Sequence, residues 1–140
     1  MRRGFKRNRG AVLAPFVMVV GAWLALAMPH RAAAEDAAKT FAAADAAGIQ
    51  SWIAAYRADP NPDAVPLLVK AIAAKGLLQE QDRAGIYIGF VAGVLADNQA
   101  TAEKLVTAMF PMPPPAQVLI IKAIAYSGLP EWKDLLGRFV

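Results

Sequence analysis

The 140-residue chain has no cysteine and a single histidine, His30. Without cysteine it forms no disulfide, presents no thiolate nucleophile, and binds neither zinc nor a lipid through sulfur. Because His30 lies beside an N-terminal apolar run, the rest of the chain has no imidazole for a Ser-His-Asp or Cys-His nucleophile or a histidine metal site. We therefore assign no catalytic, cofactor-binding or metal-ligating residue.

Acidic residues are absent before Glu35, whereas six of the 15 basic residues lie there. From Glu35 onward the 11 acidic residues outnumber the remaining bases by two. A domain with this balance has no basic patch that binds phosphates, which argues against a nucleic-acid partner. A chain that is 57% hydrophobic is also too apolar to be disordered.

The N-terminal residues have the three parts of a secretory signal peptide. A basic start precedes an uncharged run from Ala11 to Met28, and an A-x-A site formed by Ala32 and Ala34 follows. This pattern predicts cleavage after Ala34, so that Glu35 begins the mature chain. We divide the sequence into a signal peptide at 1–34 and a domain at 35–140, and expect a periplasmic or secreted bacterial protein.

Two alternatives concern this leader. The length of the apolar run reaches the lower limit for a helix that spans a bilayer, so the alternative to cleavage is an uncleaved anchor. Pro15 and Gly21 weaken such a helix. Membrane contact is expected only in that case.

The segment Arg2-Arg3-Gly4-Phe5-Lys6 also resembles a twin-arginine export signal. Arginine-rich starts produce adjacent arginines by chance, so we favour the general secretory (Sec) route and keep the twin-arginine route open.

The mature part is expected to be all-α, with about six helices. Alanine is its commonest residue, and alternating runs of β-branched residues are absent. Proline, glycine and capping residues divide the chain. The expected helices span about 36–58, 63–75, 82–96 and 98–110, followed by one that starts in the prolines at 111–115 and ends at Ser127, and one that starts near Pro130. The prolines are expected to form a stiff connector, with a polyproline ligand as the alternative.

The expected helix at 82–96 carries no charge between Arg83 and Asp97. A helix that is apolar all round is typical of the buried centre of a domain. Gly85, Gly89 and Gly93 recur every four residues, so we predict close packing of another helix against them. Membrane dimerisation through this motif is the alternative, but the apolar stretch is too short to cross a bilayer.

Residues 66–77 and 118–129 match at seven of 12 positions with an offset of 52 residues. Either these segments belong to a repeated unit in a short armadillo- or HEAT-like stack, or two alanine-rich helices closed by glycine look alike by chance. The apolar stripe of the last helix continues to the final residue. It either packs inward or meets another subunit or a partner protein, so we name self-association through this helix as one possible interaction.

The residues from Trp52 through Asp59-Pro60-Asn61-Pro62, with the segment 89–95 and the prolines after Phe110, resemble a group of uncharacterised exported all-helical bacterial proteins. The resemblance covers most of residues 50–140 and rests on hydrophobic and turn residues. It implies that the chain is an exported helical domain. It also implies that the chain is a shortened member of this group of proteins. It supplies no functional residue.

Other candidate sites have simpler structural explanations. Asp59, Asn61 and Asp63 resemble the start of a calcium loop, but the sixth and twelfth positions are Ala64 and Lys70. The acid pairs Glu80 with Asp82 and Asp59 with Asp63 suit a glycan hydrolase only across a cleft, and acids also gather at helix starts.

Charged and aromatic side chains elsewhere are expected to have structural roles. The acids at 131 and 134 are expected on a solvated face with Arg138, where Asp134 pairs with Arg138 at helical spacing. Five aromatic side chains are either core or the lining of a ligand groove. They are Trp52, Tyr56, Tyr87, Tyr126 and Trp132.

The sequence therefore predicts an exported, non-catalytic binding or scaffolding module of the bacterial cell envelope with an unknown protein partner. The alternatives are a carboxylate-dependent envelope hydrolase and a domain tethered by an uncleaved leader.

Mass spectrometry of the exported product tests the predicted leader. We expect a chain that begins at Glu35, because signal peptidase cuts after the second small residue of the A-x-A site. Full-length protein retained inside the cell would contradict this expectation.

Overall fold

The computed structural model of the chain describes residues 28–139, with the side chains at 28–32 and 81–82 left out. These residues form seven α-helices and three short 3-10 helices without strands, which confirms the all-α class and adds one helix to the expected number. The α-helices are α1 Met28–Ala43, α2 Ala46–Ala55, α3 Val65–Ala74, α4 Gln81–Asp97, α5 Ala102–Met109, α6 Pro114–Tyr126 and α7 Trp132–Gly137. The 3-10 helices are η1 Pro62–Ala64, η2 Leu77–Gln79 and η3 Gln99–Thr101.

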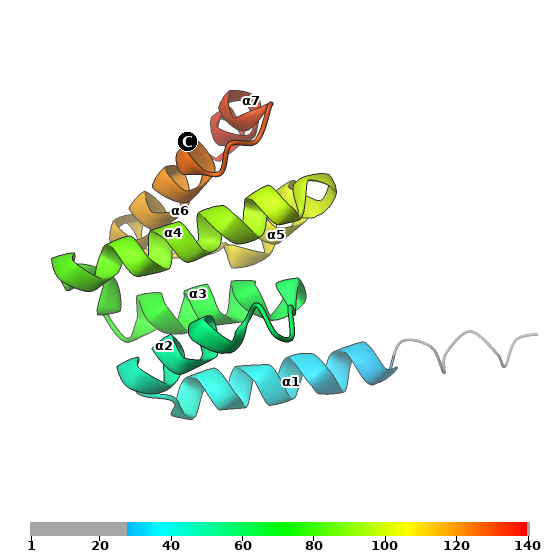
Figure 1. The fold of residues 1–140 in the computed structure, drawn as a ribbon, viewed down its shortest axis with the longest axis vertical. Coiled ribbons are helices and arrows are strands. Elements are labelled where there is room, and N and C mark those ends of the chain that lie inside the picture. Colours follow the sequence, from blue (N-terminus) through cyan, green and yellow to red (C-terminus); the bar gives the residue numbers. More distant parts are fainter. Residues whose placement is uncertain (1–27, 140) are drawn as a thin grey trace, which may run out of the picture.

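The helices form a stack of successive layers (Figure 1). Helix α3 packs against α1 on one side and α5 on the other, whereas α4 packs against α6, and α6 against α7. Three of these contacts join helices two apart in the chain, and the fourth joins the consecutive helices α6 and α7. This stacking buries one side of each helix against its neighbours.

The expected first helix at 36–58 is instead two helices, α1 and α2. Asp45 interrupts the run: its backbone is extended, and its Oδ1 accepts a hydrogen bond from the Gly48 backbone N–H at 2.8 Å. A capping carboxylate satisfies one of the donors that a helix start leaves unpaired. The prediction of one continuous helix was wrong because no proline marks this break.

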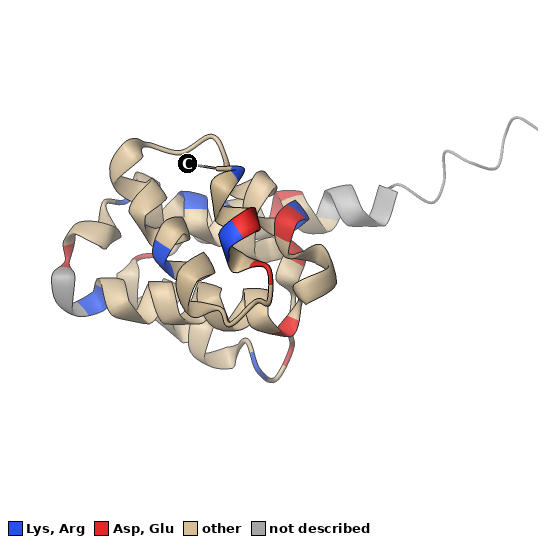
Figure 2. Ribbon diagram, turned by 90° about the horizontal axis from the view of Figure 1, so that it is seen from above, with Lys and Arg blue, Asp and Glu red and all other residues tan. Residues whose placement is uncertain are grey.

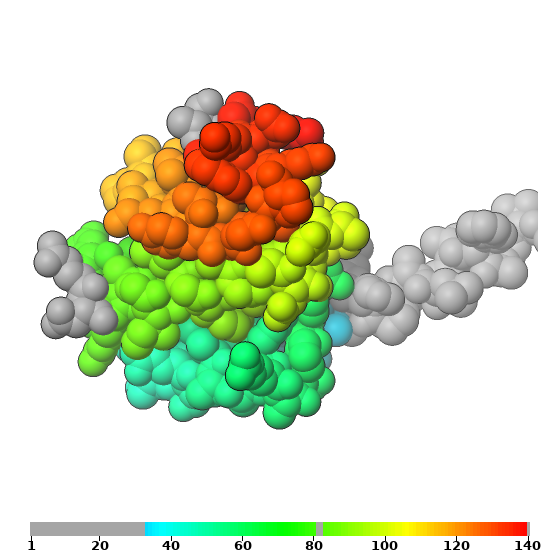
Figure 3. Space-filling model, turned by 45° about the horizontal axis from the view of Figure 1, so that its top comes forward, coloured from blue at the N-terminus to red at the C-terminus, as the bar shows by residue number. Residues whose placement is uncertain are grey.

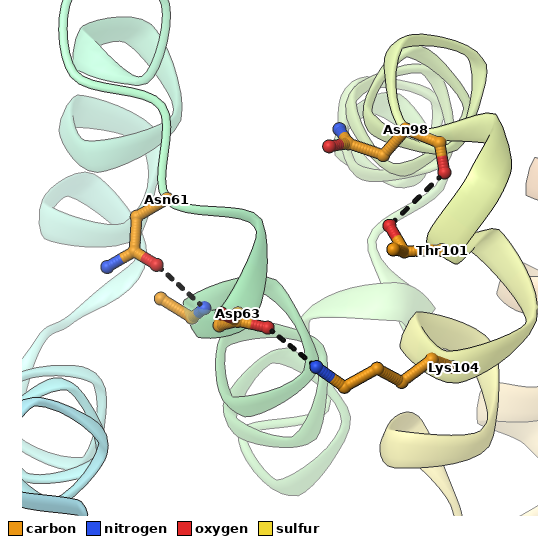
Figure 4. Close-up of polar contacts among 6 residues, drawn as sticks. Asn61, Asp63, Asn98, Thr101 and Lys104 are labelled. Atoms are coloured by element: carbon orange, nitrogen blue, oxygen red, sulfur yellow. Dashed lines mark hydrogen bonds and ion pairs between the residues drawn. The ribbon is translucent and has the colours of Figure 1, made fainter. Parts of the chain in front are cut away.

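Two asparagine side chains also form hydrogen bonds with the backbone near helix ends. Asn61 rather than Asp63 caps the turn before α3, since its side-chain oxygen accepts from the Ala64 N–H at 3.3 Å (Figure 4). Asn98 donates from its side-chain nitrogen to the Val94 carbonyl at 2.8 Å, so it closes the end of α4 instead of capping the next helix through its side chain.

Apolar side chains on one side of each helix form the core. Val65, Leu68, Val69 and Ile72 of α3 are fully buried. In α4 the buried side chains are Tyr87, Val91, Ala92, Val94 and Leu95. Full burial of a valine, leucine or isoleucine side chain removes apolar surface from water. Each such side chain stabilises the fold by about 1.5–3 kcal/mol.

The last helix packs inward. Leu135 is buried, and Trp132 and Leu136 pack against the core. The Phe139 ring stacks on Phe110 with centroids 5.4 Å apart. The stripe of α7 therefore completes the stack in this structure.

The two matching segments share a local structure. Gly76 and Gly128 end their helices with φ of 69° and 70°, and the leucine that follows each glycine is buried. The likeness stops at the next helix, because α4 has 17 residues and α7 has six. The segments thus share the same helix ending, a left-handed glycine followed by a buried leucine.

Glycine substitutions test the role of these turns. We expect Gly76→Ala and Gly128→Ala each to lower the free energy of unfolding by about 1 kcal/mol, because a Cβ is strained at positive φ. Gly89→Ala is the matched control, since it lies inside α4 where a Cβ meets nothing within 4 Å. It should raise stability by about 0.5–1 kcal/mol. Urea unfolding followed by circular dichroism measures all three, and losses of equal size would contradict the argument.

Candidate functional site

The predicted leader is mostly outside the described residues, which exclude 1–27 and the Ala32 side chain. Helix α1 runs through the predicted cleavage point, where Ala34 and Glu35 are exposed. Within the described part of the chain, no helix has the length and apolar character needed to cross a bilayer. The cleavage site stays a prediction.

Three of the four acids in the two predicted pairs have described side chains, and all three lie on the surface. Glu80 forms an ion pair with Arg83 at 2.9 Å, and Asp63 lies 3.5 Å from Lys104 of α5 (Figure 4). Asp59 is exposed, and the Asp82 side chain is outside the described set. Where side chains are described, no group of three or more acidic or imidazole residues is placed to hold a metal ion.

The five aromatic side chains do not share a groove. Tyr87 is fully buried and Tyr126 is largely exposed, while Trp132 lies beneath Lys133. Trp52 of α2 and Tyr56, the residue just after α2, instead form a cluster with rings from two other helices. In this cluster the Phe41 ring is 5.1 Å from Trp52, and the Phe90 ring is 5.0 Å from Tyr56. The cluster joins α1, α2 and α4, as edge-to-face aromatic contacts do in protein cores.

The Tyr56 hydroxyl is buried at the edge of this cluster and has no hydrogen-bond partner among the described residues. Burial raises the pKa of Tyr56, and the negative charge of Asp97 at the end of α4 raises this pKa further. Both effects disfavour the phenolate.

The predicted close packing at Gly85, Gly89 and Gly93 is wrong within the described chain. All three glycines are exposed, and a Cβ built on any of them would meet nothing within 4 Å. Helix α4 is buried along its Tyr87 and Val91 side only, so it is not enclosed all round. The glycines were misread because they lie half a turn from the core stripe, where an uncharged helix surface gives no sign of its exposure.

The exposed glycines belong to a wider surface that we call the even-helix face, made by the exposed residues of α2, α4 and α6. In Figure 3 the atoms of these helices form adjoining teal, lime-green and orange bands. Ile86 of α4 and Val118 and Tyr126 of α6 are the three exposed large hydrophobic side chains of the described chain, and these two helices pack against each other. Helix α2 has no charged residue, α4 has none between Arg83 and Asp97, and α6 has only Lys122.

Charges gather elsewhere. Figure 2 shows long stretches of uncharged, tan ribbon, with Asp and Glu often at helix ends and in the loops between helices. One such region is a groove where the start of α5 faces α7. Its volume is about 500 Å³, and we call it the α5–α7 groove. It is lined by Gln99, Ala100, Ala102, Glu103, Leu129, Pro130, Glu131, Asp134, Leu135 and Arg138.

The ion pair in this groove differs from the expected one. Arg138 pairs with Glu103 of α5 rather than with Asp134 of its own helix. The hydrogen bond to Glu103, and then the charge of Glu103, raise the pKa of Arg138. The contact joins α5 to α7, and tertiary packing alone brings these two residues together.

We compared the chain with known proteins. No family model, curated protein or solved structure matches it.

Titration of Tyr56 tests the electrostatics of the aromatic cluster. The pKa of Tyr56 should lie above the usual value near 10. The protonated hydroxyl therefore contributes to the stability of the folded state below that pH, and this contribution is lost as the pH rises through the higher pKa of the folded state. Ultraviolet absorbance of the wild type minus that of Tyr56→Phe isolates this tyrosine. We expect Asp97→Asn to bring the pKa closer to its usual value, whereas Asp59→Asn leaves it unchanged. Ionisation of Tyr56 at or below its usual pKa would contradict this account.

Proposed function

We propose that the chain is an exported, non-catalytic binding or scaffolding module of the bacterial cell envelope, and that the even-helix face contacts its protein partner. The observation that carries this proposal is that the three exposed large hydrophobic side chains, Ile86, Val118 and Tyr126, share this face. Exposed apolar patches are typical of protein interaction surfaces.

The shape of α4 supports this role. Its three exposed glycines leave open space beside the protruding Ile86 side chain. A partner helix can approach the backbone closely where Cβ atoms are missing. The near absence of charge removes the cost of desolvating ionised groups as such a surface is covered.

The surroundings of the carboxylates support a role without chemistry. Glu80 and Asp63 lie on the surface beside Arg83 and Lys104, respectively. Acid–base catalysis by a carboxyl group usually relies on a pKa shifted by burial or by a second acid. Surface positions beside cations favour roles in stability and solubility instead.

Export is the second part of the proposal. It is supported by the basic start, the apolar run and the A-x-A site of the sequence. Cleavage after Ala34 would remove the first seven residues of α1 and leave the residues from Glu35 to Ala43. Phe41, the buried side chain that joins α1 to the aromatic cluster, lies in the part that remains.

Site-specific crosslinking tests the proposed surface. A photoreactive residue at Ile86 or Val118 should form adducts in cells, and one at Ala38 or Ala108, which are exposed on α1 and α5, should not. An adduct of twice the chain mass would identify a second copy as the partner.

A substitution that fills the glycine surface provides the specific control. Gly89→Leu adds a side chain where nothing lies within 4 Å, so the fold should tolerate it. Loss of a central contact typically weakens the binding free energy of an interface by about 1–2 kcal/mol. The adduct yield should therefore fall about tenfold. Equal adducts from both sets of positions, or an unchanged yield in Gly89→Leu, would refute the proposal.

A further inference from the structure

We propose that the α5–α7 groove binds an extended peptide segment in which a lysine or arginine adjoins an aliphatic residue. This site is separate from the even-helix face and goes beyond the proposed function. The inference rests on three properties of the groove: its charge, its floor and its size.

The charge of the groove is negative. Its lining holds the three carboxylates Glu103, Glu131 and Asp134 but only one cation, Arg138. The ion pair with Arg138 occupies Glu103. Glu131 and Asp134 have no ion pair within 4 Å among the described side chains, and they act on Arg138 only over a longer distance, where their charges add to the rise of its pKa. Two carboxylates thus face the groove without a direct cationic partner, and a cation on a ligand complements them.

The floor of the groove is apolar. Ala102, Leu129 and Leu135 line it and are each at least nine-tenths buried. Pro130 and the exposed Ala100 add apolar surface at the rim. Because the floor residues are already buried within the fold, the apolar surface that a ligand can cover comes mainly from Pro130 and Ala100. An aliphatic side chain beside the cation covers this surface and gains the free energy of burying apolar area.

The size and composition of the groove favour a peptide over an ion. Its volume of about 500 Å³ is far larger than a metal ion needs and lies in the usual range for bound organic groups. No cluster of three metal-binding side chains occurs in the described residues. The excess of carboxylates disfavours phosphate and other anions. A cationic peptide matches the charge, the floor and the volume together.

Binding of two labelled peptides to the full chain tests this inference. The first is a fluorescent pentapeptide with alternating lysine and leucine, and the second has glutamate in place of lysine. Fluorescence anisotropy should show saturable binding of the first peptide only. The affinity should weaken as salt is raised, because exposed charge pairs are screened over about 10 Å at 0.1 M salt.

Charge variants locate the site. Glu131→Gln with Asp134→Asn should weaken binding about three- to tenfold, the size expected for two exposed charge pairs. Glu80→Gln with Asp59→Asn changes the net charge equally at exposed carboxylates outside the groove and should leave the affinity unchanged. An equal loss in both double variants would show non-specific attraction and overturn the proposal.

A steric variant keeps the test independent of the stability of α7. Ala100→Phe places a ring in the groove at an exposed position and should abolish saturation, whereas Ala38→Phe on the exposed surface of α1 should not. Undiminished binding by Ala100→Phe, or equal binding of the two peptides by the wild type, would refute the proposal. Because the Gly89→Leu crosslinking experiment probes another surface, failure of either proposal is distinguishable from failure of the other.

Discussion

The packing of α4 against α6 is the contact on which the arrangement of the other helices depends. Helix α4 is the longest element that the structure describes, and its buried side holds Tyr87 and Val91 in the centre of the core. Phe90 on the same helix contacts Trp52 and Tyr56, so α4 also anchors α2. One helix therefore joins the early and late parts of the stack.

This one-sided burial separates two kinds of surface. The outward side of α4 faces solvent with glycines and Ile86, and α6 adds Val118 and Tyr126 beside it. Charged residues are sparse in this region and gather around loops and helix ends, including the α5–α7 groove. The molecule thus presents a face with few charges and a groove in which carboxylates outnumber cations. Neither surface needs chemistry of its own to take part in binding.

Local features of the sequence were sufficient for much of the fold. The absence of alternating β-branched runs and the positions of proline and glycine predicted helices, and the apolar sides of α3 and α5 are buried. Gly76 and Gly128 adopt the left-handed conformation because glycine has no Cβ to strain it. The break at Asp45 was missed, since an aspartate inside an alanine-rich run is as compatible with an exposed helix position as with a cap.

The sequence by itself determined the helical class, the main turns and the absence of histidine and cysteine chemistry, because these follow from residue type and from neighbours a few positions away. Only the tertiary structure decided which side of α4 meets water, since the stretch between Arg83 and Asp97 has no charge to mark its exposed side. It also decided that Arg138 pairs with Glu103 instead of Asp134. Contacts between residues far apart in the chain depend on how whole helices pack, and helical spacing alone cannot specify them.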